Sequence, residues 1–154
     1  MTFQDKEYNE IIKQLREEHP IDEMVKFNNT DIQDKLSENS FLIVTYKDLY
    51  LRERAAYDKI NKLKEEESGR IFHGLRFPKD RGQEADRWIA DRANNDIRTA
   101  EIKEYYIPNP PKIKQIDKLL RLQKARVDFF DLCVSSLEKM AWSMKGFLDA
   151  EKLM

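Results

Sequence analysis

The last third of the chain carries the longest amphipathic pattern. Apolar residues recur at alternating spacings of three and four from Ile113 to Leu148, over about five heptads. A second column at every seventh position widens this stripe, through Leu119, Arg126, Cys133, Met140 and Phe147. A widened stripe suits a helix packed in a bundle or larger assembly. The pattern predicts one helix over 109–154, with Asn109 as its N-cap and Pro110 at the first helical position.

A helix of about 40 residues extends roughly 60 Å, which is more than one small globule usually buries. We therefore expect part of the stripe to face another subunit. The stretch 127–148 is aromatic, sulfur-rich and nearly without bases. It is predicted to form the core of a homo-oligomer, with these interface positions: Val127, Phe130, Val134, Leu137, Met140, Ala141, Met144, Phe147 and Leu148.

Shorter helical patterns precede this one. Residues 4–18 predict an amphipathic helix that ends at His19-Pro20, because the residue before a proline is pushed out of the α region. A short helix is expected at 31–38. The seam from Leu42 to Leu63, interrupted only by Glu53, then predicts a helix of about 25 residues.

Local signals set the expected ends of these segments. Ser40 is the expected N-cap of the 25-residue helix, and Ser68-Gly69 its expected end. Residues 84–104 regain a helical rhythm before the proline-rich break at 105–111.

These patterns together predict an all-α protein of long helices. Only four Gly and five Pro occur, too few for a β-sandwich or barrel. We expect a single domain over 1–154. It is predicted to comprise an acidic part at 1–40, helices over 41–107 with a basic loop at 70–83, and the oligomerisation helix at 109–154.

We expect a cytoplasmic protein, since one cysteine excludes an internal disulfide and no secretory signal follows Met1. No run of about 18 apolar residues is present, so no membrane partner is expected. Catalytic constellations are also missing. His19 and His73 lie far apart, and Cys133 sits in the apolar stripe. The interpretation is a protein that is not an enzyme and uses no metal or cofactor.

The net charge of −1 conceals an asymmetry: 1–40 sums to −5 (ten acids, five bases), whereas 68–126 sums to +6 (fourteen bases, eight acids). Basic and aromatic residues mix at 70–81, a combination that holds single-stranded nucleic acid. The candidates there are Arg70, Phe72, His73, Arg76, Phe77, Lys79 and Arg81. Alternatively, Phe72 and Phe77 anchor the loop to the core while the bases are solvated.

A second basic segment occupies 112–126, where six bases face one acid. Its candidate phosphate contacts are Lys112, Lys114, Lys118 and Arg121. Bases in the first half of a helix oppose the macrodipole, which suggests another use. The alternative is a solvated face, or pairing with acidic residues of 1–40. Trp88 and Trp142 are interpreted as core or interface anchors.

The order of these parts resembles the phage UvsY family of recombination mediators. The likeness runs from IIKQLREEHPID through LIVTYKDLYLRERAAYDKINKLK and GRIFHGLRF to the closing block KIKQIDKLLRLQKARVDFFDLCVSSLEKMAWSMKGFLDAEKL. Departures are the Leu75-Arg76 step after Phe72-His73-Gly74, where the family usually has Gly-Lys or Gly-Arg after paired aromatics, and the unmatched segment EYYIPNPP.

This resemblance implies a ring-like homo-oligomer that binds single-stranded DNA in DNA recombination, repair and replication. Such proteins help load a RecA-like recombinase by displacing or remodelling single-strand-binding protein, and are not enzymes. If this is a phage protein, the host cytoplasm is its expected location. The alternative is a helical structural or adaptor protein, of the phage assembly or scaffold type, without DNA binding.

Overall fold

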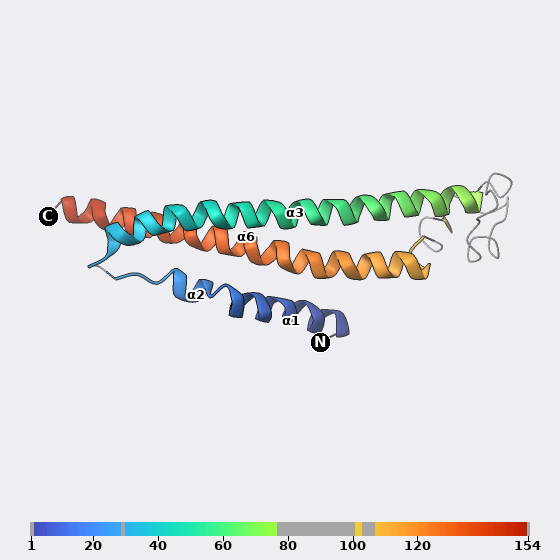
Figure 1. The fold of residues 1–154 in the computed structure, drawn as a ribbon, viewed down its shortest axis with the longest axis horizontal. Coiled ribbons are helices and arrows are strands. Elements are labelled where there is room, and N and C mark those ends of the chain that lie inside the picture. The colour runs from blue at the N-terminus through green and yellow to red at the C-terminus, as the bar shows by residue number, and fades with distance from the viewer. Residues whose placement is uncertain (1, 29, 77–100, 103–106, 154) are drawn as a thin grey trace. The chain divides into compact units, whose positions relative to one another are not determined.

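The computed structural model describes residues 2–28, 30–76, 101–102 and 107–153. Over these residues the elements are α1 (Phe3–Glu18), α2 (Ile21–Met24), α3 (Ile32–Arg76) and α6 (Pro111–Lys152), without any strand (Figure 1). The all-α prediction is confirmed. Two compact units divide the chain. The first unit is Met1–Tyr57 with Arg121–Met154, and the second unit is Asp58–Leu120.

Helix α1 forms where the sequence predicted it. Thr2 and Asp5 make a capping box: the Thr2 hydroxyl accepts from the Asp5 N–H at 3.2 Å, and the Asp5 carboxylate accepts from the Thr2 N–H at 3.1 Å. The hydrogen bonds from Thr2 lower the pKa of Asp5. At the other end His19 is the C-cap, directly before Pro20. Leu15 is fully buried on the apolar face of this helix.

Helix α3 corrects two predictions, since it runs unbroken from Ile32 through the expected start at Ser40 and the expected end at Ser68-Gly69. The Ser40 hydroxyl donates to the Leu36 carbonyl at 3.1 Å, so it is satisfied inside the helix and does not cap it. A glycine in a helix costs about 1 kcal/mol. Burial of Ile71 and Leu75 beyond Gly69 offsets this cost. Residues 70–76 are therefore helix and not loop.

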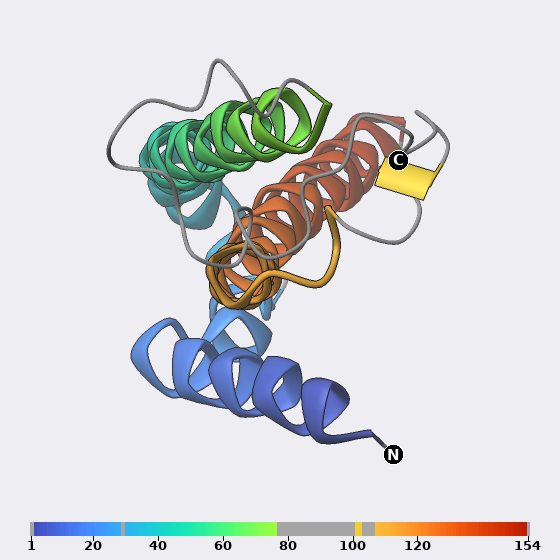
Figure 2. The same cartoon turned by 90° about the vertical axis from the view of Figure 1, so that its right-hand side faces the viewer.

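The first unit has its own core, in which α3 and α6 run antiparallel. The buried Asn39 amide, for example, donates to the Leu137 carbonyl at 3.1 Å. Helices α1 and α2 cover one side of this α3–α6 pair (Figure 2). The fully or nearly fully buried side chains are Leu15, Ile21, Ile32, Tyr46, Phe129, Phe130, Cys133, Leu137, Met140 and Met144.

Aromatic rings fill the centre of this core. His19 packs edge-on against Tyr46 and Phe130, with ring centroids 5.6 and 5.3 Å apart, and its Nδ1 lies 3.0 Å from the Tyr46 hydroxyl. Burial raises the pKa of Tyr46. The junction between α1 and α2 is thereby fixed to both long helices.

The second unit buries a smaller cluster of Ile71, Leu75, Ile102 and Ile113, with Phe72 and Ile107 packed against it. Helix α6 begins here one residue later than predicted. The Pro110 carbonyl accepts from the Lys114 N–H at 3.1 Å, so Pro111 takes the first helical position, where its missing N–H is not needed.

The predicted stripe of α6 is confirmed as its inward face, with one exception: Leu119 is 52% exposed. Its part in the first unit packs within the chain's own core. Val127, Phe130, Leu137, Met140 and Met144 are buried, and Val134, Ala141, Phe147 and Leu148 are half-buried. Seven of the nine positions predicted for an oligomer interface, all except Val127 and Ala141, thus belong to this core or pack against it.

Leu137 and Leu132 provide a matched test of this core. Leu137 is fully buried, whereas Leu132 on the same helix is 43% exposed. We expect Leu137→Ala to lower the free energy of unfolding by about 2–5 kcal/mol and Leu132→Ala by about 0.5 kcal/mol. Urea denaturation followed by circular dichroism measures both. Equal losses would contradict this packing.

Candidate nucleic-acid interface

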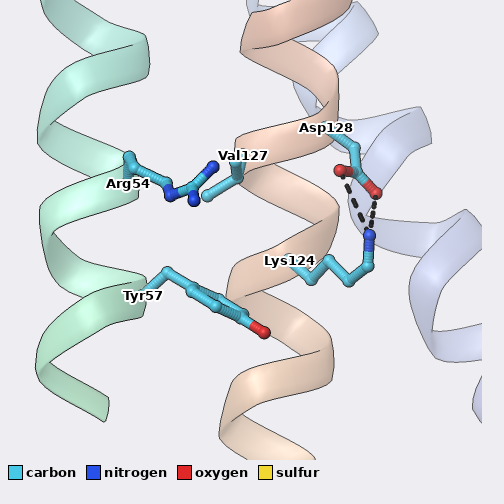
Figure 3. A pocket seen from close by; sticks show the side chains of 5 residues that line it. All are labelled: Arg54, Tyr57, Lys124, Val127 and Asp128. Atoms are coloured by element: carbon cyan, nitrogen blue, oxygen red, sulfur yellow. Dashed lines mark hydrogen bonds and ion pairs between the residues drawn. The ribbon is translucent and has the colours of Figure 1, made fainter. Parts of the chain in front are cut away.

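A pocket of about 200 Å³ opens between α3 and α6 of the first unit. It is lined by Arg54 and Tyr57 from α3, and by Lys124, Val127 and Asp128 from α6 (Figure 3). The Arg54 guanidinium points toward Val127, and the Tyr57 ring reaches across toward α6. The volume is below the range of drug-sized ligands, roughly 300–1,000 Å³, and suits a smaller group.

Asp128, the acidic residue of the pocket lining, accepts hydrogen bonds from two neighbouring side chains. The Lys124 ammonium lies 3.3 Å from Asp128 Oδ2 and 3.5 Å from Oδ1. The Tyr8 hydroxyl of α1 donates to Oδ2 at 2.8 Å. Burial, together with this bond to the carboxylate, raises the pKa of Tyr8. Two cations and one acid leave the pocket with a local charge of +1, beside a half-buried aromatic ring.

A polar layer crosses the α3–α6 seam next to the pocket. Glu53 accepts from Arg126 Nη2 at 2.9 Å and from the Gln123 amide at 2.5 Å, and this amide also donates to the Glu53 carbonyl at 2.8 Å. The hydrogen bond from Arg126 lowers the pKa of Glu53, and the same bond raises the pKa of Arg126. Glu53 was visible in the sequence as the only break in its apolar series, but its partners were not identified.

The second unit holds a comparable cluster around Glu67, whose side chain is 8% exposed. Glu67 pairs with Arg70 Nη2 at 2.6 Å and with Lys112 Nζ at 3.3 Å. The hydrogen bond from Arg70 is the main cause that lowers the pKa of Glu67. Two candidate phosphate contacts are thus held by an acid that sequence reasoning did not single out. A buried carboxylate requires such partners.

The remaining candidates of 70–83 fall into three groups. Phe72 is half-buried against the second core, which favours the anchoring alternative for this residue. His73 is exposed on α3, and Arg76 is its last residue. The predictions for Phe77, Lys79 and Arg81 lie outside the described residues.

On α6 the candidates differ in exposure. Lys114 and Lys118 are exposed, and Asp117 between them pairs with Lys64 at 2.7 Å. Arg121 is half-buried, and its Nε has no hydrogen-bond partner among the described residues. Lys112 pairs with an acid, but this acid is Glu67 and does not belong to the segment 1–40 that the alternative named. Trp142 is 78% exposed, so it is not a core residue.

Cys133 occupies the centre of the first core and is fully buried. Burial raises the pKa of its thiol to about 12. A thiol held protonated is a poor nucleophile and a poor metal ligand. Among the described residues no group of three or more His, Cys, Asp or Glu side chains is placed to hold a metal ion.

Comparisons with known proteins add no assignment: no family model, curated protein or solved structure matches the chain. None of the helices within the described ranges is both long and apolar enough to cross a membrane.

Glu53 makes stability depend on pH. Its pKa in the folded chain is below the ordinary value of 4.5, so it stabilises the fold above that pH and loses this effect as the pH falls. We expect Glu53→Gln to lower the free energy of unfolding by about 1–2 kcal/mol at neutral pH, with the difference fading as the pH falls below 4.5. Urea titrations across this range measure it. The exposed Glu10→Gln is the control, and a constant Glu53→Gln deficit at all pH values would contradict the assignment.

Burial of Cys133 predicts slow labelling. An aromatic disulfide reagent should modify Cys133 only as fast as the folded chain opens, and at once in denaturant. The control is Leu132→Cys in a Cys133→Ala background, which places an exposed thiol one residue away and should react immediately. Absorbance of the released thiolate follows both reactions. Immediate labelling of the native chain would show that this core is open.

Proposed function

We propose that the protein is a homo-oligomeric, single-stranded DNA-binding recombination mediator that helps load a RecA-like recombinase. In this role it acts without catalysis, in the cytoplasm of the host if it is a phage protein. It displaces or remodels single-strand-binding protein already on the DNA. The resemblance to the UvsY family supports this role.

The observation that carries the proposal is the pocket of the first unit. Arg54 provides one cation, Lys124 provides a second for which a phosphate would compete with Asp128, and Tyr57 provides an aromatic ring. Single-stranded nucleic acid is bound by this combination, because cations follow the backbone while rings accept bases. Asp128 contributes a hydrogen-bond acceptor for the amino group of a base.

Exposed cations on α6 extend the proposal in the second unit. Lys114 and Lys118 are exposed, and phosphates could therefore approach them. Arg70 and Lys112 contribute less than the sequence suggested, because a phosphate would compete with Glu67 for them. Contacts from Arg76, Phe77, Lys79 and Arg81 remain predicted.

DNA binding is tested by fluorescence anisotropy with a labelled single-stranded oligonucleotide at increasing salt. We expect Arg54→Gln/Lys124→Gln to weaken binding about tenfold at low salt. The log–log salt slope should fall by about 1.4, because each phosphate contact to a single strand contributes about 0.7. The control, Lys13→Gln/Lys139→Gln, removes the same charge from exposed positions that do not line the pocket.

Two results would contradict the proposal at different levels. Equal weakening by both double variants would exclude the pocket as a contact. Absence of binding by the wild-type chain at low salt would exclude DNA binding altogether. In that case the adaptor alternative would be favoured, for which the exposed Phe41, Val44, Leu51 and Trp142 offer protein-binding surface.

A further inference from the structure

The carboxylate of Asp128 is only partly satisfied by its protein partners. Its Oδ2 accepts from the Tyr8 hydroxyl at 2.8 Å and lies 3.3 Å from the Lys124 ammonium. Among the described residues its Oδ1 is approached only by the same ammonium, at the long distance of 3.5 Å. An ionised carboxylate has about four acceptor positions, and the Asp128 side chain is 40% exposed. Oδ1 therefore retains the capacity to accept a hydrogen bond from a group bound in the pocket.

The other lining residues of the pocket suit one flat ring. Val127 is buried and is the apolar member of the lining, and the Tyr57 ring reaches across toward α6 (Figure 3). Aromatic side chains accept the face of a base, and a cation such as Arg54 beside them accepts its phosphate. A volume of about 200 Å³ is too small for a drug-sized ligand, but a single nucleobase is smaller than such a ligand. The pocket therefore has the dimensions and the surfaces for one nucleotide.

Cytosine and thymine have the same ring but differ in the groups that they present to a carboxylate. Cytosine carries a 4-amino group, which donates, next to the N3 acceptor, whereas thymine carries a carbonyl oxygen at position 4. The N3–H of thymine also donates, but carbonyl oxygens flank it on both sides, and a carboxylate repels them. On α6 an acceptor, Asp128, lies beside a donor, Lys124. This pair is complementary to the amino group and N3 of cytosine.

We propose that the pocket binds one base of single-stranded DNA and prefers cytosine to thymine, with Asp128 Oδ1 accepting from the 4-amino group. Lys124 has three N–H donors, so it can contact N3 and a phosphate together. Asp128 is the residue that determines this preference. The inference rests on the proposed DNA-binding function and adds a base preference to it. Because water competes for a carboxylate that is 40% exposed, we expect a preference of about fivefold, the lower end for a base-specific contact.

Fluorescence anisotropy with single-stranded homopolymers of equal length, at one low salt concentration and neutral pH, measures this preference. We expect the wild-type chain to bind oligodeoxycytidine about fivefold more tightly than oligodeoxythymidine. Oligodeoxyuridine should bind like oligodeoxythymidine, because uracil has the same carbonyl oxygen at position 4 and lacks only the methyl group. If oligodeoxyuridine bound as tightly as oligodeoxycytidine, the pocket would exclude the methyl group, and recognition of the amino group would be overturned.

Two matched variants test the role of Asp128. An amide both accepts and donates, so Asp128→Asn should bring the ratio of the cytosine and thymine affinities close to one. Loss of a negative charge should raise both affinities, but this general effect leaves the ratio unchanged. The control is Asp131→Asn, which removes the same charge from an exposed position of α6 that does not line the pocket and should keep the fivefold ratio. Circular dichroism verifies that each variant is folded.

The outcomes separate the base preference from DNA binding itself. Binding with a wild-type ratio of one, or a ratio that survives Asp128→Asn, would overturn the base preference and leave the proposed function standing. Absence of binding to all three homopolymers would overturn both.

Discussion

The carboxylate of Glu53 is the constraint on which the register of the first unit depends. It lies in an apolar seam, where a charge is tolerated only with partners, and Arg126 and Gln123 provide them from α6. A slip of one residue along α3 would separate these partners and expose the carboxylate to apolar neighbours. Apolar contacts alone tolerate such shifts, so the polar layer defines the pairing that they stabilise.

This register also positions the pocket. Arg54 follows Glu53 directly, and Lys124 and Val127 each lie next to a residue that bonds Glu53. The hydrogen bonds of Glu53 therefore stabilise the fold and also position the cations of the candidate interface. The second unit has a similar arrangement. Glu67 pairs with Arg70 and Lys112 and thereby makes them less available to bind other anions.

Much of the helical architecture could be predicted from periodicity, because a helix that buries one face repeats apolar residues every three or four positions. The end of α1 at His19-Pro20 and the inward face of α6 are examples. Other features depend on tertiary contacts that no local signal encodes. Gly69 suggested a helix end, but burial of Ile71 and Leu75 outweighed it. The candidate site was predicted less well: the sequence singled out Arg70 and Lys112 by charge, and only spatial proximity revealed Glu67 between them. Nothing in the residues around Arg54 and Tyr57 in the sequence marked these two as candidates.

Asp128 connects α1 to the pocket. Its carboxylate binds both Lys124, which lines the pocket, and Tyr8, which lies on α1. An anion that draws Lys124 away leaves the carboxylate more dependent on Tyr8, so the docking of α1 and the occupation of the pocket are thermodynamically linked. Such linkage is reciprocal: if a bound anion changes how tightly α1 docks, then the docking of α1 changes the affinity for that anion by the same factor. The acidic N-terminal helix would thus be an adjustable component of the proposed binding surface, and it also covers the core.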